Sequence, residues 1–91
     1  MRFAGLPGSD LVTRGLDDLA QGVLSVPALL VAVGAPRLRS LGVEVASTPR
    51  APERALYERL AETEGDAAHA RYNALIRRLV SFERALACAG R

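Results

Sequence analysis

Arginine side chains near the carboxyl end of the sequence offer its clearest opportunity for binding chemistry. They form two pairs, and the members of each pair are seven residues apart, so a helix would carry all of them on adjacent tracks of its outer side. A row of guanidinium groups can donate to successive phosphate oxygens and release counterions. No helix-turn-helix pattern, zinc spacing or interleaved aromatic residue accompanies them, so nucleic-acid binding is the alternative hypothesis and a solvated or acid-paired face is favoured. The residues are Arg71, Arg77, Arg78 and Arg84.

The single histidine, His69, lies close in sequence to the carboxylates of Glu64 and Asp66. Imidazole and carboxylate groups can together hold a metal ion or transfer a proton. The spacing matches no recognised ligand pattern, because one histidine with two loop-borne acids more often caps or packs against a helix. We therefore expect no metal site and no cofactor.

The remaining reactive side chains give little support to an enzymatic function. Cys88 has no histidine near it and lies at the negative end of a predicted helix, where thiolate formation is disfavoured. Asp17 and Asp18 are adjacent, so they point in different directions on a helix. The rings of Tyr57 and Tyr72 are expected to approach each other as packing groups. The sequence therefore predicts a protein that is not an enzyme.

Composition predicts a small, soluble helical domain. The 91 residues are 49% hydrophobic and 24% charged, with only 4% aromatic residues, so the core must be built from Leu, Val and Ala. All twelve basic residues are arginine, which indicates a GC-rich genome, and the net charge of +2 is small. The longest apolar run, 26–33, is too short to cross a membrane and contains Pro27. With one cysteine and no segment resembling a signal peptide, we expect a cytoplasmic protein that does not contact a membrane.

Helix signals divide the single predicted domain, 1–91, into N-terminal helices over 9–45, a connector over 46–51 and a C-terminal helical hairpin over 52–89. The first helix should run from Ser9 to about Ala20 or Gln21, with Ala20 and Val23 on its apolar stripe, and should stop at Gly22.

Ser25 should cap a second helix that is apolar on all sides, and Gly34 should end it before a short helical turn over 36–41. A helix without a polar side is expected at the centre of the core or between subunits. Residues 43–45 alternate in polarity, but a strand this short has little to stabilise it.

The C-terminal half predicts a helix from Pro52 to Glu64, a turn at Gly65, and a long helix from Asp66, its expected N-cap, to Ala89. Its apolar positions recur at alternating intervals of four and three, which is typical of a coiled coil or antiparallel bundle. The acidic helix over 52–64 should pair at its rim with the basic long helix. We call these apolar positions the seam: Ala68, Tyr72, Leu75, Leu79, Phe82, Leu86 and Ala89.

The predicted fold is therefore all-α, a bundle of about four helices with the long C-terminal helix in an antiparallel hairpin. The shorter helix covers only about half of the seam, since an α-helix rises about 1.5 Å per residue. We expect the rest to be covered by the N-terminal helices, by a second subunit, or by both. The leading functional hypothesis is a non-enzymatic, self-associating protein-protein interaction module, a homodimer. Its predicted interface residues are Leu79, Phe82, Leu86, Leu29 and Leu30.

Overall fold

A computed structural model describes residue 3 and residues 5–89 of the chain. All regular secondary structure in this part of the chain is helical, which confirms the all-α prediction, and 43–45 form an extended loop rather than a strand. No helix formed by these residues is both long enough and apolar enough to cross a membrane. The elements are α1 (Ser9–Ala20), α2 (Val26–Ser40), α3 (Pro52–Glu64), the 3-10 turn η1 (Gly65–Ala67) and α4 (Ala68–Ala89).

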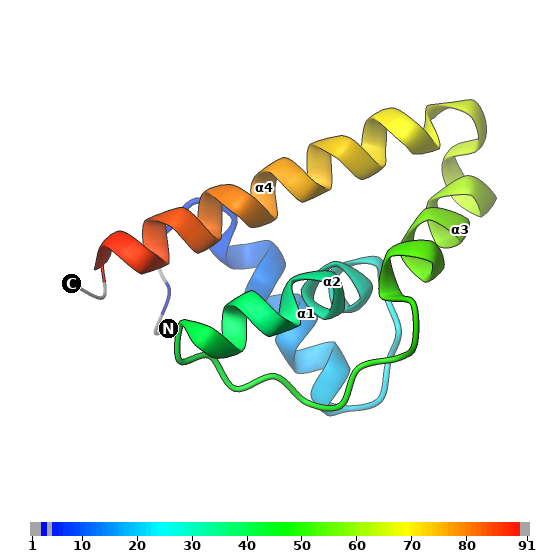
Figure 1. The fold of residues 1–91 in the computed structure, drawn as a ribbon. Helices are drawn as coiled ribbons and strands as arrows, with labels where there is room; N and C mark the ends of the chain where they lie inside the picture. Colours follow the sequence, from blue (N-terminus) through cyan, green and yellow to red (C-terminus); the bar gives the residue numbers. More distant parts are fainter. Residues whose placement is uncertain (1–2, 4, 90–91) are drawn as a thin grey trace.

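Helix α2 lies at the centre of the fold and contacts α1, α3 and α4 (Figure 1). Figure 1 shows α4 running along one side of the molecule, with α1 and α2 on its inner side and α3 joined to it through η1 at one end. Leu30, Val31 and Leu38 of α2 have no exposed surface. The prediction that the wholly apolar helix occupies the core is therefore confirmed.

Helix α1 begins and ends at the predicted residues, but its predicted apolar stripe extends too far. Ala20 and Val23 are exposed. The helix ends at Ala20, and Gly22 then adopts a left-handed backbone with φ of 75°, which turns the chain away from the helical path. Val23 consequently lies on the loop between α1 and α2 instead of continuing the buried face.

The predicted break at Gly34 does not occur, because α2 continues through Gly34 and Pro36 to Ser40. Gly34 marks a close helix crossing: a Cβ atom there would lie 2.8 Å from Leu79 Cδ2 on α4. Pro36 removes one backbone donor from the helix, but continuing the helix buries Leu38 completely. Tertiary packing therefore overrides two local helix-breaking signals.

The start of α2 is fixed by Ser25, as predicted. The Ser25 hydroxyl accepts a hydrogen bond from the Ala28 backbone N–H at 3.2 Å and donates to Asp18 Oδ2 at 2.5 Å. Asp18 is half-buried and ties α1 to the cap of α2. The same contact holds the loop that carries Val23.

The segment between α2 and α3 is held by side-chain contacts to its backbone. The Arg39 guanidinium donates to the carbonyl oxygens of Val45 and Ala46 at 3.1 and 3.0 Å. Ala51 adopts a left-handed conformation with φ of 45° just before Pro52 begins α3. At the other end of α3, Asp66 lies inside η1, so it is not the N-cap of a longer helix as predicted, and α4 begins at Ala68.

Candidate functional site

The residues predicted to form an oligomer interface are mostly buried within the single chain. Leu29 and Leu79 are 3% exposed, Leu30 and Phe82 are fully buried, and Leu86 is half-buried. Helix α2, which carries Leu29 and Leu30, contacts α4, and Phe3 packs on Phe82. Four of the five side chains therefore expose almost no surface to a partner in this fold.

The cover over the distal part of the seam is a specific contact. The rings of Phe3 and Phe82 meet edge to face with centroids 5.4 Å apart, a preferred aromatic geometry. Gly8 approaches the same turn of α4, where a Cβ atom would lie 3.0 Å from the Arg78 carbonyl oxygen. Of the remaining seam residues, Ala68 and Leu75 are buried, Tyr72 is half-buried and Ala89 is exposed.

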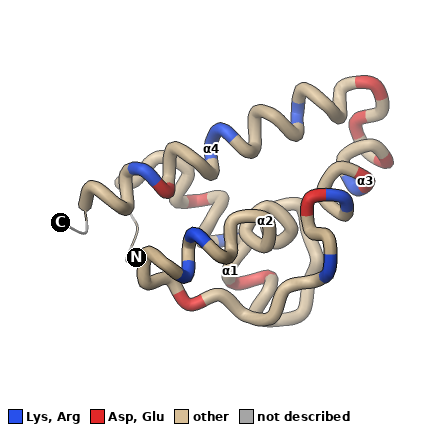
Figure 2. The backbone as a smooth tube through the Cα atoms, in the orientation of Figure 1, with Lys and Arg blue, Asp and Glu red and all other residues tan. Residues whose placement is uncertain are grey.

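The arginine row is spread along α4 (Figure 2). Its four side chains are exposed, and two of them are paired with acids. Arg71 Nε is 3.9 Å from Glu64 Oε1, and Arg78 Nη2 is 3.2 Å from Asp10 Oδ1. Within the described residues, Arg77 and Arg84 form no ion pair. The pairing of Arg71 with Glu64 is the contact expected between the acidic and basic C-terminal helices.

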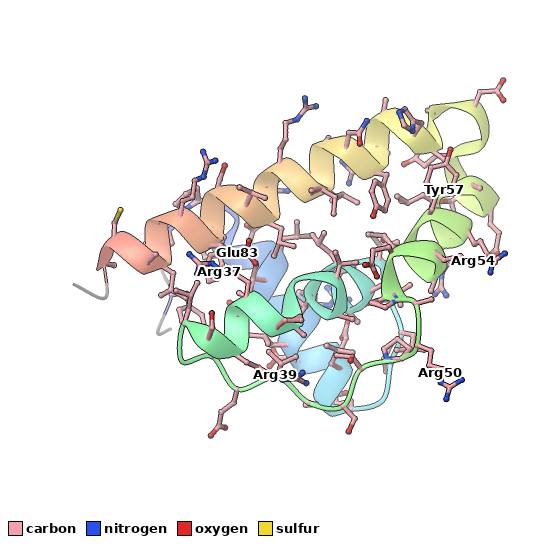
Figure 3. The ribbon with its side chains drawn as sticks, viewed as in Figure 1. Arg37, Arg39, Arg50, Arg54, Tyr57 and Glu83 are labelled. Carbon is pink, nitrogen blue, oxygen red and sulfur yellow. The ribbon has the colours of Figure 1, made fainter. Side chains whose placement is uncertain are left out.

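The histidine region is an exposed packing cluster. His69 Nε2 lies 3.3 Å from Asn73 Nδ2. The rings of Tyr57 and Tyr72 approach each other as predicted, with their centroids 5.8 Å apart. Tyr57 lies near the middle of α3 (Figure 3). Burial, with a smaller contribution from the Glu53 carboxylate, raises the pKa of the Tyr72 phenol. The described residues contain no group of three side chains able to hold a metal ion.

One carboxylate, Glu83, lies half-buried between α4 and α2, next to Arg37 (Figure 3). Burial raises the pKa of the Glu83 carboxyl, and the Arg37 guanidinium opposes part of that increase. Gly34 makes room for it, since a Cβ atom at that position would be 3.1 Å from Glu83 Oε2. Glu83 therefore lies where α2 and α4 meet.

Large exposed apolar side chains lie elsewhere, at Tyr57 of α3 and on the loop between α1 and α2. On that loop Val23 and Leu24 are 47% and 43% exposed, and Leu24 lines a groove of about 210 Å³ between the start of α2 and the side of α3. Apolar and charged side chains both line this groove, and the charged ones come from α3. We call it the α3 groove, and its lining residues are Leu24, Leu29, Ala55, Glu58, Arg59 and Glu62.

The sequence contained a signal for this groove that the periodicity analysis missed. Val23 and Leu24 are two consecutive large apolar residues between a glycine stop and a serine cap. A loop of this length places neighbouring side chains in different directions, so it cannot bury both. Assigning Val23 to the stripe of the first helix concealed the exposed pair.

Comparison with known proteins identifies no relative. No protein-family model, curated protein sequence or solved structure matches this chain.

Proposed function

We propose that this chain is a non-enzymatic helical protein-protein interaction module of the cytoplasm, and that it self-associates as a dimer through the α3 groove. The observation that carries the proposal is the adjacent exposed pair, Val23 and Leu24, of which Leu24 lines the α3 groove. The seam is already covered within the chain, so the exposed apolar surface is the better contact site.

The energetics favour covering this surface. Burying an exposed leucine or valine fully contributes about 1.5–3 kcal/mol, so covering the exposed parts of Val23 and Leu24 contributes roughly 1 kcal/mol each. Adjacent apolar residues surrounded by charges are typical of a small protein contact: the centre excludes water and the rim remains solvated.

In this proposal α3 and α4 act as an antiparallel helical hairpin that presents the groove. Arg71 and Glu64 join the two helices beside the turn, and the Tyr57 and Tyr72 rings pack across it. The buried Leu56 and Leu60 fix the inner face of α3 against the core. The opposite face of α3, with Glu58 and Glu62, is thereby held at the surface.

The substitution Leu24→Glu tests this proposal. It replaces an apolar lining residue of the groove with a charge, so the self-association constant should fall by about tenfold or more. The measurement is the weight-average mass by light scattering across a concentration series. Ser47→Glu, an exposed change in the connector, is the matched control and should leave the mass unchanged. A Leu24→Glu protein that associates as strongly as the wild type contradicts the proposal.

Nucleic-acid binding is the second candidate, supported by the exposed and unpaired Arg77 and Arg84 within the described part of α4. It is weaker because Asp10 and Glu64 already neutralise Arg78 and Arg71. This function predicts that labelled duplex or single-stranded DNA is retained at low salt and released steeply as salt increases. Retention lost in an Arg77→Glu, Arg84→Glu double variant supports it, and no retention at low salt eliminates it.

A further inference from the structure

The charged rim of the α3 groove carries one unpaired base and one unpaired acid. Arg54 Nε and Glu58 Oε1 lie 3.3 Å apart and form an ion pair on the outer side of α3. Among the described residues, neither Arg59 nor Glu62 forms an ion pair, and both line the groove. The rim therefore presents two opposite charges that neighbouring residues leave available.

The spacing of these two charges fits a two-fold axis. Residues three apart on a helix lie on the same side of it, so Arg59 and Glu62 point toward the same space. In a contact across a two-fold axis, every contact occurs twice. If one residue of the first copy contacts a second residue of the other copy, the same two residues also make contact with the copies exchanged. Two antiparallel α3 helices that cross between Leu60 and Ala61 place Arg59 of each copy opposite the other copy's Glu62.

The direction of the Leu60 side chain leaves this approach open. Leu60 is 2% exposed and faces the core of its own chain, so it does not stand between the two helices. Leu24 of each copy lies in the adjoining groove and supplies the apolar part of the contact.

We infer that α3 pairs with α3 of a second copy across a two-fold axis, with reciprocal Arg59 to Glu62 ion pairs flanking the apolar groove. The inference rests on the proposed function of self-association and adds the surface, the symmetry and the paired residues. A second copy fits this rim because the rim carries both signs of charge. A nucleic acid does not, because α3 contains four glutamates against two arginines.

The contact is a small one, so the dimer should be weak. Protein contacts that bury less than about 1,200 Å² are typical of transient complexes. Because the reciprocal ion pairs are exposed, they act mainly on specificity and are screened by salt. Self-association should therefore weaken when salt is added.

Charge reversal tests the pairing directly. In the Arg59→Glu variant each new glutamate faces Glu62 of the other copy, and in the Glu62→Arg variant each new arginine faces Arg59 of the other copy. Each single variant therefore has two repulsive pairs per dimer and should raise the dissociation constant of the dimer about tenfold. The double variant Arg59→Glu, Glu62→Arg restores opposite charges at both positions. It should return the constant to within about threefold of the wild-type value, as measured by sedimentation equilibrium.

Controls separate this pairing from a general effect of charge. Arg84→Glu changes the net charge by the same amount as Arg59→Glu but does so on the outer side of α4, so it should leave the dissociation constant unchanged. Circular dichroism should show the same helix content in every variant, since all substituted side chains are exposed. If the wild type dimerises but both single reversals leave its dissociation constant unchanged, the α3 pairing is overturned while self-association stands. The same holds if the double variant does not restore the dissociation constant. A wild-type chain that remains monomeric overturns the pairing and the proposed function together.

Discussion

Phe82→Ala is expected to lower the free energy of unfolding by about 3–5 kcal/mol, a large part of the 5–15 kcal/mol available to a domain of ordinary stability. Phe82 is fully buried and its ring meets that of Phe3 edge to face. Removing the ring leaves a cavity between α4 and Phe3. Urea denaturation followed by circular dichroism measures the loss.

The concentration dependence of this loss distinguishes a core residue from an interface residue. Because the chain itself covers Phe82, the loss should be the same at low and high protein concentration. Leu86→Ala is the matched comparison on the same face of α4, and its half-buried side chain should cost only about 1–2 kcal/mol. A Phe82→Ala loss below about 1 kcal/mol, or one that appears only at high concentration, contradicts the placement of Phe82 in the core of one chain.

Gly15→Ala should destabilise the protein by about 2 kcal/mol or more, even though alanine is the better helix former by about 1 kcal/mol. Gly15 lies in the middle of α1, where α1 and α2 approach most closely. A Cβ atom there would overlap the Pro27 carbonyl oxygen and lie 2.5 Å from Val31 Cγ2. Backbone atoms cannot move aside without separating the two helices, so the loss should be visible as a lower thermal midpoint.

Gly34→Ala provides the comparison, since Gly34 is also a helical glycine at a crossing. Its added Cβ would meet the ends of the Leu79 and Glu83 side chains at 2.8 and 3.1 Å. Side-chain ends can rotate away, and the gain in helix propensity offsets the adjustment, so the stability should change by less than about 1 kcal/mol. Equal losses at the two positions would show that backbone proximity at Gly15 is not what limits the packing of α1 on α2.

Local signals predicted most of the helix boundaries because the residues responsible act on their own neighbours. The Ser25 hydroxyl caps α2, Gly22 allows the left-handed turn after α1, and Pro52 starts α3. The same kind of signal failed at Gly34 and Pro36, where the reason for continuing the helix lies in Leu79 of α4 and in the burial of Leu38. No local pattern contains that information.

The site was harder to predict than the fold. A repeat of four and three at Leu79 and Phe82 shows that one helix face must be covered, but it has the same form whether the cover comes from the same chain or from another. In the structure α2 packs on this face near Leu79 and Phe3 packs on Phe82. The proposed contact surface includes Leu24 instead, an exposed apolar residue in a loop, which no helical repeat could have identified.

The most direct test of the proposed function is the mass of the wild-type chain by light scattering coupled to size exclusion, over a wide concentration range. We expect a mass near 9.7 kDa at low concentration that rises toward twice that value as concentration increases. The rise should weaken with salt, because charged pairs border the proposed contact. A mass that stays at 9.7 kDa up to about 1 mM would contradict self-association through the α3 groove.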